Sequence, residues 1–401
     1  MIPGLFGHRP FLLYFWARLG SEFSHQIGAV AVGWQVYALT RSAVDLGIVG
    51  LVEFIPTAAL VFIAGHAADR YDRRRMVQVC QAVAALTAAF LAWGSYAGWL
   101  TVPEIFAAVA VLGTVTAFES PADAALLPGV TPDGLFQQAT ALATGGFQIA
   151  IITGPALGGI AYAVAPGAPY TMMAGFWLLA AILNGAIRLD RPVASEAESP
   201  TFAALFEGVR FVRKNPAILG TISLDLFAVL LGGATALLPI YARDILHTGP
   251  WGLGVLRGAP AVGALLMSAV LARQPITRRA GLRMFQAVIV FGLATIVFGA
   301  SRSLWLSIAA LAILGAADAV SMVIRISLVQ LATPDAMRGR VGAVNFLFVN
   351  ASYQLGGFES GITAALFGAV PAVLLGGVGT VLVALLWMRL FPTLRRVERL
   401  E

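Results

Sequence analysis

Twelve long apolar segments constrain this chain more than any other feature of its sequence. An α-helix needs about 20 residues to cross the hydrocarbon core of a bilayer, and each segment is close to that length or longer. Because 59% of the residues are hydrophobic and only 11% are charged, against about 25% charged in soluble domains, a soluble or disordered protein is excluded. The segments are also too long for the alternating strands of about 10 residues in membrane barrels. The predicted spans are 11–39, 44–66, 76–98, 103–126, 138–164, 169–187, 217–241, 251–272, 284–301, 304–330, 341–367 and 369–391.

The lysines and arginines predict how these spans are oriented. Of the 26 Lys and Arg residues, 20 fall in segments on the side of the N-terminus, three fall on the opposite side and three lie within spans. Since cytoplasmic segments are enriched in Lys and Arg, both termini are expected in the cytoplasm. Topology alone explains the basic residues, so no nucleic-acid partner is expected. The lone Cys80 excludes an intrachain disulfide.

The two halves of the sequence repeat one another at a spacing of 202 residues. Thr131-Pro132-Asp133 recurs as Thr333-Pro334-Asp335, and two glycines of the fifth span recur at Gly356 and Gly361. Parallel repeats of this kind are typical of transporters built from two halves. We therefore expect an all-α membrane protein of two pseudo-symmetric six-helix halves, residues 1–190 and 217–401. A cytoplasmic linker, 191–216, joins them, with an amphipathic helix at 202–214 on the inner membrane face.

A polar string from Gly65 to Arg74 follows the second predicted span. Gly65 permits close contact with another helix, and Asp69 can accept hydrogen bonds at the end of the span. The string resembles the signature loop of the major facilitator superfamily, Gly-x-x-x-Asp-Arg-x-Gly-Arg-Arg, with Asp72 in place of the second glycine. In that superfamily a carboxylate of the fourth span pairs with the loop, which assigns a gating role here to Asp123. The gating arginines implied by the resemblance are Arg70, Arg73 and Arg74. The alternative is a basic cluster that only sets topology.

The fifth predicted span contains Gly154, Pro155, Gly158 and Gly159. Proline removes a backbone hydrogen bond, and glycine lets a second helix approach closely. The string resembles the Gly-Pro-x-x-Gly-Gly core of the superfamily's antiporter motif, which implies export. Ordinary helix packing is the alternative reading.

The whole chain looks most like the siderophore- and drug-exporting branch that includes enterobactin exporters. This resemblance rests on three strings, Leu224-Asp225-Leu226-Phe227, Leu238-Pro239-Ile240-Tyr241-Ala242 and Arg338-Gly339-Arg340-Val341. It implies a multi-pass protein of a bacterial inner membrane. It also implies a small-molecule substrate, protons and lipid as partners, a monomer, and a proton gradient in place of any cofactor or metal.

Ionisable residues inside the predicted spans are the candidates for substrate binding and proton coupling. A charge at the middle of a membrane costs several kcal/mol unless it is paired or hydrated, so it indicates function by default. The candidates are Arg18, Glu22, Glu53, Glu119, Asp225, Asp318, Arg325 and Glu359. The helical spacing places Glu22 near Arg18 and Asp318 near Arg325. Each pair is expected either to hold helices together or to exchange a proton when substrate approaches.

These observations predict a secondary active transporter that exports an amphipathic small molecule, such as a drug or siderophore, in exchange for protons. An importer of a small metabolite, proton-coupled or facilitative, and a sensor that kept the fold but lost transport, are the alternatives. An enzyme is not expected because the sequence has only four histidines and no His-Glu-x-x-His string. An ATP-driven pump is not expected because no Gly-x-x-x-x-Gly-Lys-Ser/Thr string occurs. A channel would need a filter loop, and none is visible.

Overall fold

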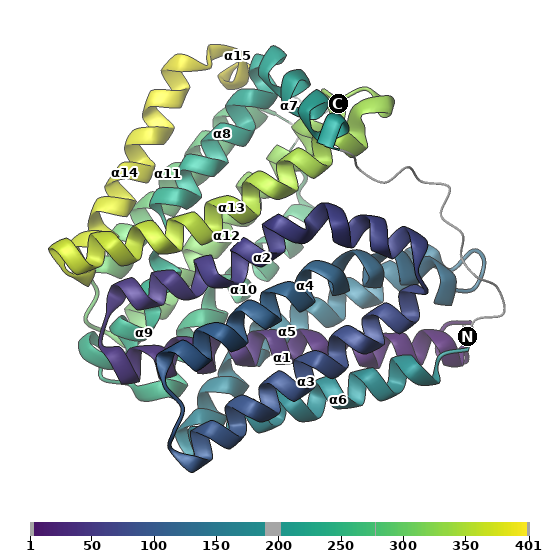
Figure 1. Ribbon diagram of the computed structural model, residues 1–401. Helices are drawn as coiled ribbons and strands as arrows, with labels where there is room; N and C mark the ends of the chain where they lie inside the picture. The colour runs from purple at the N-terminus through teal and green to yellow at the C-terminus, as the bar shows by residue number, and fades with distance from the viewer. Residues whose placement is uncertain (1–3, 189–201, 277, 399–401) are drawn as a thin grey trace. The chain divides into compact units, whose positions relative to one another are not determined.

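The computed structural model describes residues 4–188, 202–276 and 278–398. These residues form helices joined by connections, with no β-strand among them (Figure 1). The first six helices are α1 (Arg9–Thr40), α2 (Ala43–Arg70), α3 (Arg73–Ala97), α4 (Val102–Val130), α5 (Phe136–Val164) and α6 (Ala168–Ala186). The next elements are α7 (Phe202–Lys214), α8 (Pro216–Leu231), η1 (Ala234–Leu237), α9 (Leu238–Ile240) and η2 (Tyr241–Ile245). The last are α10 (Gly249–Arg273), α11 (Ala280–Ala300), α12 (Leu304–Leu331), α13 (Asp335–Phe367), α14 (Ala369–Leu390) and α15 (Pro392–Arg395).

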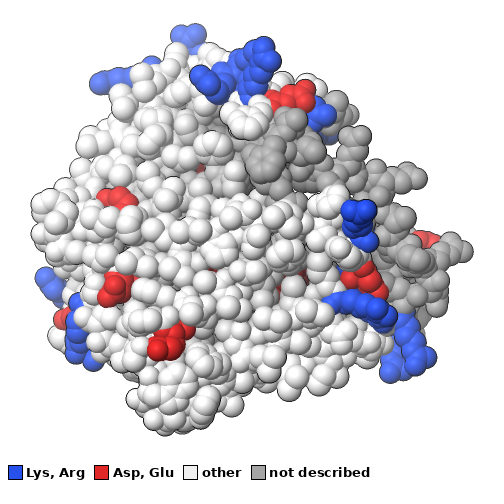
Figure 2. All heavy atoms as spheres, in the orientation of Figure 1, with Lys and Arg blue, Asp and Glu red and all other residues white. Residues whose placement is uncertain are grey.

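Every predicted span lies on helical backbone apart from single residues at some ends, and the seventh continues from α8 past Gly232 and Gly233 into η1, α9 and η2. By length and composition, nine helical segments of the described chain could cross a membrane. The other three predicted spans are α1, α6 and α13, and two of these carry ionisable residues that lower their hydropathy. The prediction of a twelve-helix membrane protein is confirmed. Figure 2 agrees with it, because the visible face is mainly uncharged, as a surface in contact with lipid should be.

The chain divides into two compact units. Unit 1 comprises 1–40, 52–199 and 249–254, and unit 2 comprises 41–51, 200–248 and 255–401. Within unit 1, α6 packs against both α1 and α3, α5 packs against α1, and α3 packs against α4. Within unit 2, α11 packs against α12 and α14, and α8 packs against α13 and α14. The division into halves at 190 and 217 remains a prediction, since these units are defined by packing and take short segments from both sides.

Side chains at helix starts explain where two of the helices begin. Asp72, which replaces the family glycine, caps α3 by accepting hydrogen bonds from the backbone amides of Arg74 and Arg75. Asn215 caps α8 in the same way, accepting from the amides of Ala217 and Ile218. The polar residues that interrupt the apolar segments therefore stabilise helix starts that would otherwise leave free amides.

The predicted amphipathic helix is α7, with the predicted bounds. Val212 is buried in a cluster with Ile218 of α8 and Val344 of α13. Gly208 lies so close to the backbone of Arg340 that a side-chain carbon there would sit 2.8 Å from its carbonyl oxygen. Thus α7 packs its apolar face on α8 and α13 of unit 2. The linker residues 189–201 lie outside the described residues.

Candidate functional site

The first candidate cluster in unit 1 joins α1 to α4. Arg18 donates hydrogen bonds to the Oδ2 atom of Asp123 at 2.6 Å and to the hydroxyl of Tyr14 at 2.8 Å. The Tyr14 hydroxyl in turn donates to the same carboxylate oxygen at 3.2 Å. The three side chains therefore close a triangle between two helices, with the phenol bridging cation and anion.

This cluster corrects two sequence predictions. Arg18 takes Asp123 as its ion-pair partner rather than Glu22, because spacing along one helix says nothing about acids on a neighbouring helix. Asp123 was assigned to the loop after the second span, but its ion-pair partner is an arginine of α1. Glu22 is half-buried and lies near enough to Arg18, His25 and Glu119 to interact with their charges.

A second cluster in unit 1 surrounds Glu119, whose residue is only 7% exposed. Its Oε1 atom accepts from the hydroxyl of Ser21 at 2.8 Å and from the amide nitrogen of Gln81 at 3.0 Å. Its Oε2 atom lies 3.9 Å from Nε2 of His25 and makes no hydrogen bond. Residues of four helices therefore surround the carboxylate: α4 carries it, α1 and α3 contact it directly, and Asn184 and Trp177 of α6 bond to the two donors.

The donors around Glu119 form two chains that start on α6. Asn184 donates to the oxygen of Gln81 at 2.8 Å, and Gln81 donates onward to Glu119. The indole nitrogen of Trp177 donates to Ser21 at 3.1 Å, and Ser21 donates onward to Glu119. Both chains point toward one carboxylate oxygen, an arrangement that stabilises a negative charge there.

Among the described residues of unit 2, a buried ion pair joins α8 to α12. Asp225 and Arg325 contact each other directly, and their side chains are 8% and 6% exposed. The sequence paired Arg325 with Asp318 instead, and this pairing is wrong. The two residues share a face of α12, but seven positions separate them by about 10 Å along the axis. Asp225 approaches from the neighbouring helix at the depth of the guanidinium.

Asp318 is not part of that ion pair and lines a small cavity beside it. The cavity has a volume of about 10 Å³, room for about one water molecule. Asp225 and Ser321 also line it, together with apolar residues of α8, α11 and α12. The role of Asp318 in proton coupling or substrate binding remains a prediction.

The remaining predicted acids make simpler contacts. Glu359 of α13 accepts a hydrogen bond from Thr363, one turn further on, at 2.7 Å. Glu53 is half-buried on α2, where its backbone oxygen accepts from Thr57, which also donates to the backbone oxygen of Gly113 on α4. Among the described contacts, neither carboxylate makes a hydrogen bond or ion pair with the two clusters of unit 1 or the ion pair of unit 2.

The loop between α2 and α3 is held mainly by bonds from arginines to backbone oxygens. Arg73 donates to Ala68 at 3.1 Å and to Ala125 of α4 at 3.2 Å. Arg74 donates to Ile187, just beyond the end of α6, at 2.5 Å. Both arginines thereby place positive charge near the negative ends of helices.

Three further predictions for this loop have different outcomes. Arg70 is exposed at the end of α2. A side-chain carbon at Gly65 would meet no atom within 4 Å, so the predicted close helix contact at this glycine is wrong. The side chain of Asp69 lies outside the described part of the chain.

The glycines of α5 make the close contacts that their sequence predicts. A side-chain carbon at Gly158 would lie 3.0 Å from the backbone of Ile27, and one at Gly154 would lie 2.6 Å from Gln26. Gly159 packs in the same way on the backbone of Pro250, one of the residues 249–254 that belong to unit 1. Pro155 is buried within the continuous helix. The motif thus forms a close seam, in which Gly158 and Gly159 face backbone and Gly154 faces the side chain of Gln26.

Sequence reasoning missed Tyr14, Ser21, Gln81, Trp177 and Asn184. The signal for two of them was present, because Gln81 and Asn184 are uncharged amides inside otherwise apolar spans. A buried amide costs free energy unless it is hydrogen-bonded, so each one predicts a polar partner. The hydroxyl and indole groups gave no such signal, since serine, tyrosine and tryptophan are common in membrane helices.

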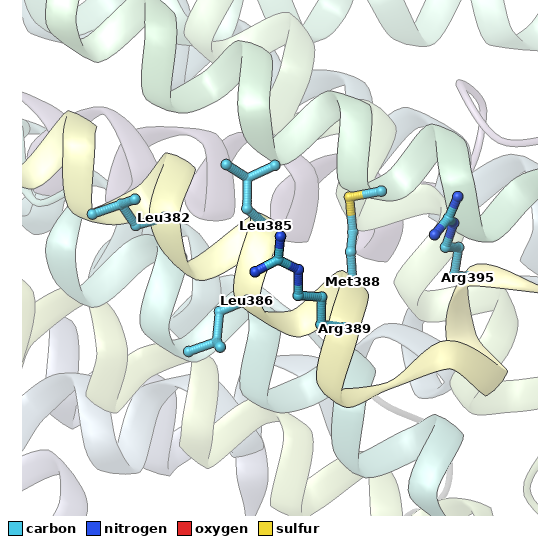
Figure 3. Close-up of a pocket in the computed structure, with 6 residues that line it drawn as sticks. All are labelled: Leu382, Leu385, Leu386, Met388, Arg389 and Arg395. Carbon is cyan, nitrogen blue, oxygen red and sulfur yellow. The ribbon is translucent and has the colours of Figure 1, made fainter.

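Another hollow lies elsewhere, along α14 and α15. It has a volume of about 510 Å³ and is lined by Leu382, Leu385, Leu386, Met388, Arg389 and Arg395 (Figure 3). The three leucines are about half exposed. The hollow contains none of the predicted site residues, and its apolar wall fits contact with lipid. Among the described residues, no group of three or more His, Cys, Asp and Glu side chains could hold a metal ion.

Comparisons with known proteins agree with this architecture. The profile of a family described as a transmembrane secretion effector matches residues 6–400. The multidrug efflux pump Tap of Mycolicibacterium fortuitum is 28% identical over 399 residues, which cover 93% of this chain and 95% of the pump. The enterobactin exporter EntS of Citrobacter koseri is 25% identical over 397 residues, covering 98% and 94%.

Solved structures share the fold. The nucleoside transporter NupG superposes with a TM-score of 0.73 at 14% identity, covering 95% of this chain and 99% of the transporter. A bacterial homologue of the human lysosomal transporter Spinster, inward-facing and occupied, gives a TM-score of 0.75 at 13% identity, covering 96% and 97%.

Proposed function

Because the chain belongs to the transmembrane secretion effector family of the major facilitator superfamily, we propose that it exports amphipathic small molecules in exchange for protons. The observation that carries the proposal is the full-length similarity to proteins named as a multidrug efflux pump and an enterobactin exporter. A fold of two six-helix halves supports transport by alternating access. The protein would thus be a transporter rather than an enzyme.

Proton coupling is supported by acids buried at membrane depth in both units. Such groups cost several kcal/mol unless they are paired, hydrated or protonated, so a protein keeps them where they act. Glu119 and Asp318 lie within long apolar helices and lack an arginine partner among the ion pairs described above. A proton that binds or leaves one of them changes the charge of its unit, which biases one conformation over another. The proton gradient then serves as the energy source, and no cofactor is required.

The setting proposed for this activity is a bacterial inner membrane with both termini in the cytoplasm. The excess of Lys and Arg on one side supports the orientation, and the relatives named above are bacterial proteins. We expect the working unit to be a monomer in contact with lipid, since each half forms its own packed set of helices.

Flux into proteoliposomes tests the proposal. The cargo panel would contain ethidium, a permanently charged dye that a pH gradient cannot trap, together with a tetracycline and enterobactin. With an acidic lumen and the membrane potential clamped, an antiporter accumulates cargo inside. Accumulation only with an acidic exterior would instead indicate a proton-coupled importer, and equilibration without accumulation would indicate a facilitator.

The controls are protein-free liposomes and an added protonophore, which should abolish accumulation. No pH-driven accumulation of any compound in the panel would overturn proton-coupled export.

A further inference from the structure

We propose that Glu119, together with His25, is the proton-binding site of unit 1. The proposal rests on proton-coupled transport and identifies the group that carries the proton. Three carboxylates in the described residues are largely buried and have charged or polar partners from other helices: Asp123, Asp225 and Glu119. An arginine neutralises the first two at close range. Only a histidine, itself able to lose its charge near neutral pH, faces the third.

The two oxygens of Glu119 have different surroundings. Oε1 accepts two hydrogen bonds, from Ser21 and Gln81, and both donors are held by residues of α6. Oε2 is buried, makes no hydrogen bond and faces Nε2 of His25 at 3.9 Å. One oxygen is therefore fixed by donors, while the other is free to hold a hydrogen. A hydrogen on Oε2 would point toward the imidazole after a shift of under one ångström.

The groups around this pair define three protonation states. With one proton, His25 is an imidazolium and Glu119 a carboxylate, and the charges compensate. A second proton, on Oε2, leaves the imidazolium without its counter-ion. When the imidazolium loses its extra proton, His25 becomes neutral, and Glu119 is left as a buried carboxylate that only neutral donors stabilise. Each step changes the net charge of a buried site by one unit, and such a site resists that change unless the helices around it move.

Other titratable groups approach this site from several helices. Glu22 and Arg18 lie on α1 with His25, Asp123 lies one turn along α4 from Glu119, and Glu53 of α2 acts on His25. Cys80 of α3 is the neighbour of Gln81. Arg18 is already bound to Asp123, so the arginine does not neutralise Glu119. The acids Glu22 and Glu53 add negative potential, which favours a proton on the His25–Glu119 pair.

The arrangement also links proton binding to helix packing. Glu119 touches α1 through Ser21 and His25, α3 through Gln81, and reaches α6 through the donor chains. His25 packs edge-on against the indole of Trp177, with 5.3 Å between ring centroids. A change of charge at one carboxylate therefore acts on four helices of unit 1 together.

Infrared difference spectroscopy of the purified protein during a pH titration tests this assignment without any substrate. Protonation of Glu119 should give the carbonyl band of a carboxylic acid, and Glu119→Gln should remove that band. The matched control is Glu104→Gln, the same substitution in the first turn of the same helix, which should leave the band in place. A band of unchanged intensity in Glu119→Gln would overturn the proposal.

A second variant keeps the carboxylate and removes one of its hydrogen-bond donors. Gln81→Leu removes a donor to the ionised form, so the same band should appear at a higher pH than in the wild type. An unchanged titration in Gln81→Leu would count against the site even if Glu119→Gln folded poorly.

A transport assay distinguishes the proposal for Glu119 from the proposal of proton-coupled export. In proteoliposomes, Glu119→Gln should lose accumulation of ethidium driven by the pH gradient, by 10-fold or more, and retain exchange of ethidium at equal pH. Wild-type accumulation with an unaffected Glu119→Gln variant would overturn the role of Glu119 and leave proton-coupled export standing. Absence of accumulation in the wild type itself would instead reject proton-coupled export.

Discussion

The two units use the same ion pair with its charges exchanged. Arg18 is the tenth residue of α1, and Asp225 is the tenth residue of α8. Asp123 is the twenty-second residue of α4, and Arg325 is the twenty-second residue of α12, 202 residues later. In unit 1 the arginine lies on the first helix of the pair, whereas in unit 2 it lies on the second. The ion pairs thus occupy equivalent positions in the two units, but the signs of the charges at these positions are exchanged.

This exchange suggests what the pairs do. A group that moves a proton must be an acid at a defined place, whereas a clamp between two helices needs only opposite charges. We therefore interpret Arg18–Asp123 and Asp225–Arg325 as clamps that hold equivalent helices together in each unit. The Glu119 network has no such counterpart, because position 321, 202 residues after Glu119, is a serine. Because the Glu119 network differs between the two units, we assign the specialised role of proton binding to this network.

The largest effect is expected from breaking the clamp of unit 2. Arg325→Ala leaves Asp225 charged and buried without a partner, which should lower the free energy of unfolding by about 3–5 kcal/mol. Unfolding in mixed detergent micelles, followed by circular dichroism, measures the change. The exchanged variant Asp225→Arg with Arg325→Asp should recover most of the loss. If Arg325→Ala were as stable as the wild type, the Asp225–Arg325 pair would not act as a clamp between the helices.

Copying the acid of unit 1 into unit 2 gives the next largest effect. Ser321→Glu places a carboxylate at the position equivalent to Glu119, but without the hydroxyl and amide donors that α1 and α3 supply in unit 1. A charge at the centre of a membrane helix costs about 3 kcal/mol, so the loss of stability should be of that order at neutral pH and smaller in acid, where the carboxyl is protonated. The same unfolding assay at two pH values measures both. Ser321→Gln is the uncharged control, and an equal loss in both variants would mean that size, not charge, is responsible.

The clamp of unit 1 should be weaker than that of unit 2. Its side chains are 27% and 14% exposed, against 6% and 8% in unit 2, so water shares in neutralising them. Asp123→Ala should therefore cost about 1.5–3 kcal/mol, in the range for a hydrogen bond to a charged group. The exchanged variant Arg18→Asp with Asp123→Arg serves as the control. A larger loss here than for Arg325→Ala would reverse the ranking of the two pairs.

Tyr14→Phe should have the smallest effect. Tyr14 bridges Arg18 and Asp123, whereas the equivalent residue of α8 is Thr221, which bonds to its own helix at Ala217. Removing the hydroxyl should cost about 0.5–1.5 kcal/mol, the usual worth of a hydrogen bond, and leave the ion pair in place. Stability of Tyr14→Phe compared with Asp123→Ala checks the order, and Thr221→Val is the matched change in unit 2. A loss as large as that of Asp123→Ala would show that the phenol, not the ion pair, joins the helices.

The sequence predicted the helices and their number because hydropathy records how long each segment is in contact with lipid. It also predicted the glycine seam of α5, since small residues at helical spacing have few other uses in a membrane. The partners of Arg18 and Arg325 could not be predicted in this way. Helical periodicity tells which residues share a face of one helix, whereas both arginines bind acids that a neighbouring helix supplies.

Only part of the candidate site could be predicted from the sequence, for a related reason. Glu119 and Asp318 stand out as acids in apolar segments, but the donors that define the surroundings of Glu119 are uncharged and widely separated. Gln81 and Asn184 are 103 residues apart and meet only when α3 packs against α6. Their function as positioning residues is a property of packing, which one sequence does not record.

The seam between α1 and α5 has a consequence for how cargo preference can change. Where Gly158 meets the backbone of Ile27, no side chain separates the two helices. A larger residue at Gly158 would push the two helices apart, so this strip of α5 is closed to substitution. New selectivity has to arise on other faces, such as the face of α1 where Trp16 is 57% exposed. A library of variants that alters ligand range should therefore collect changes there, and leave the glycines of α5 untouched.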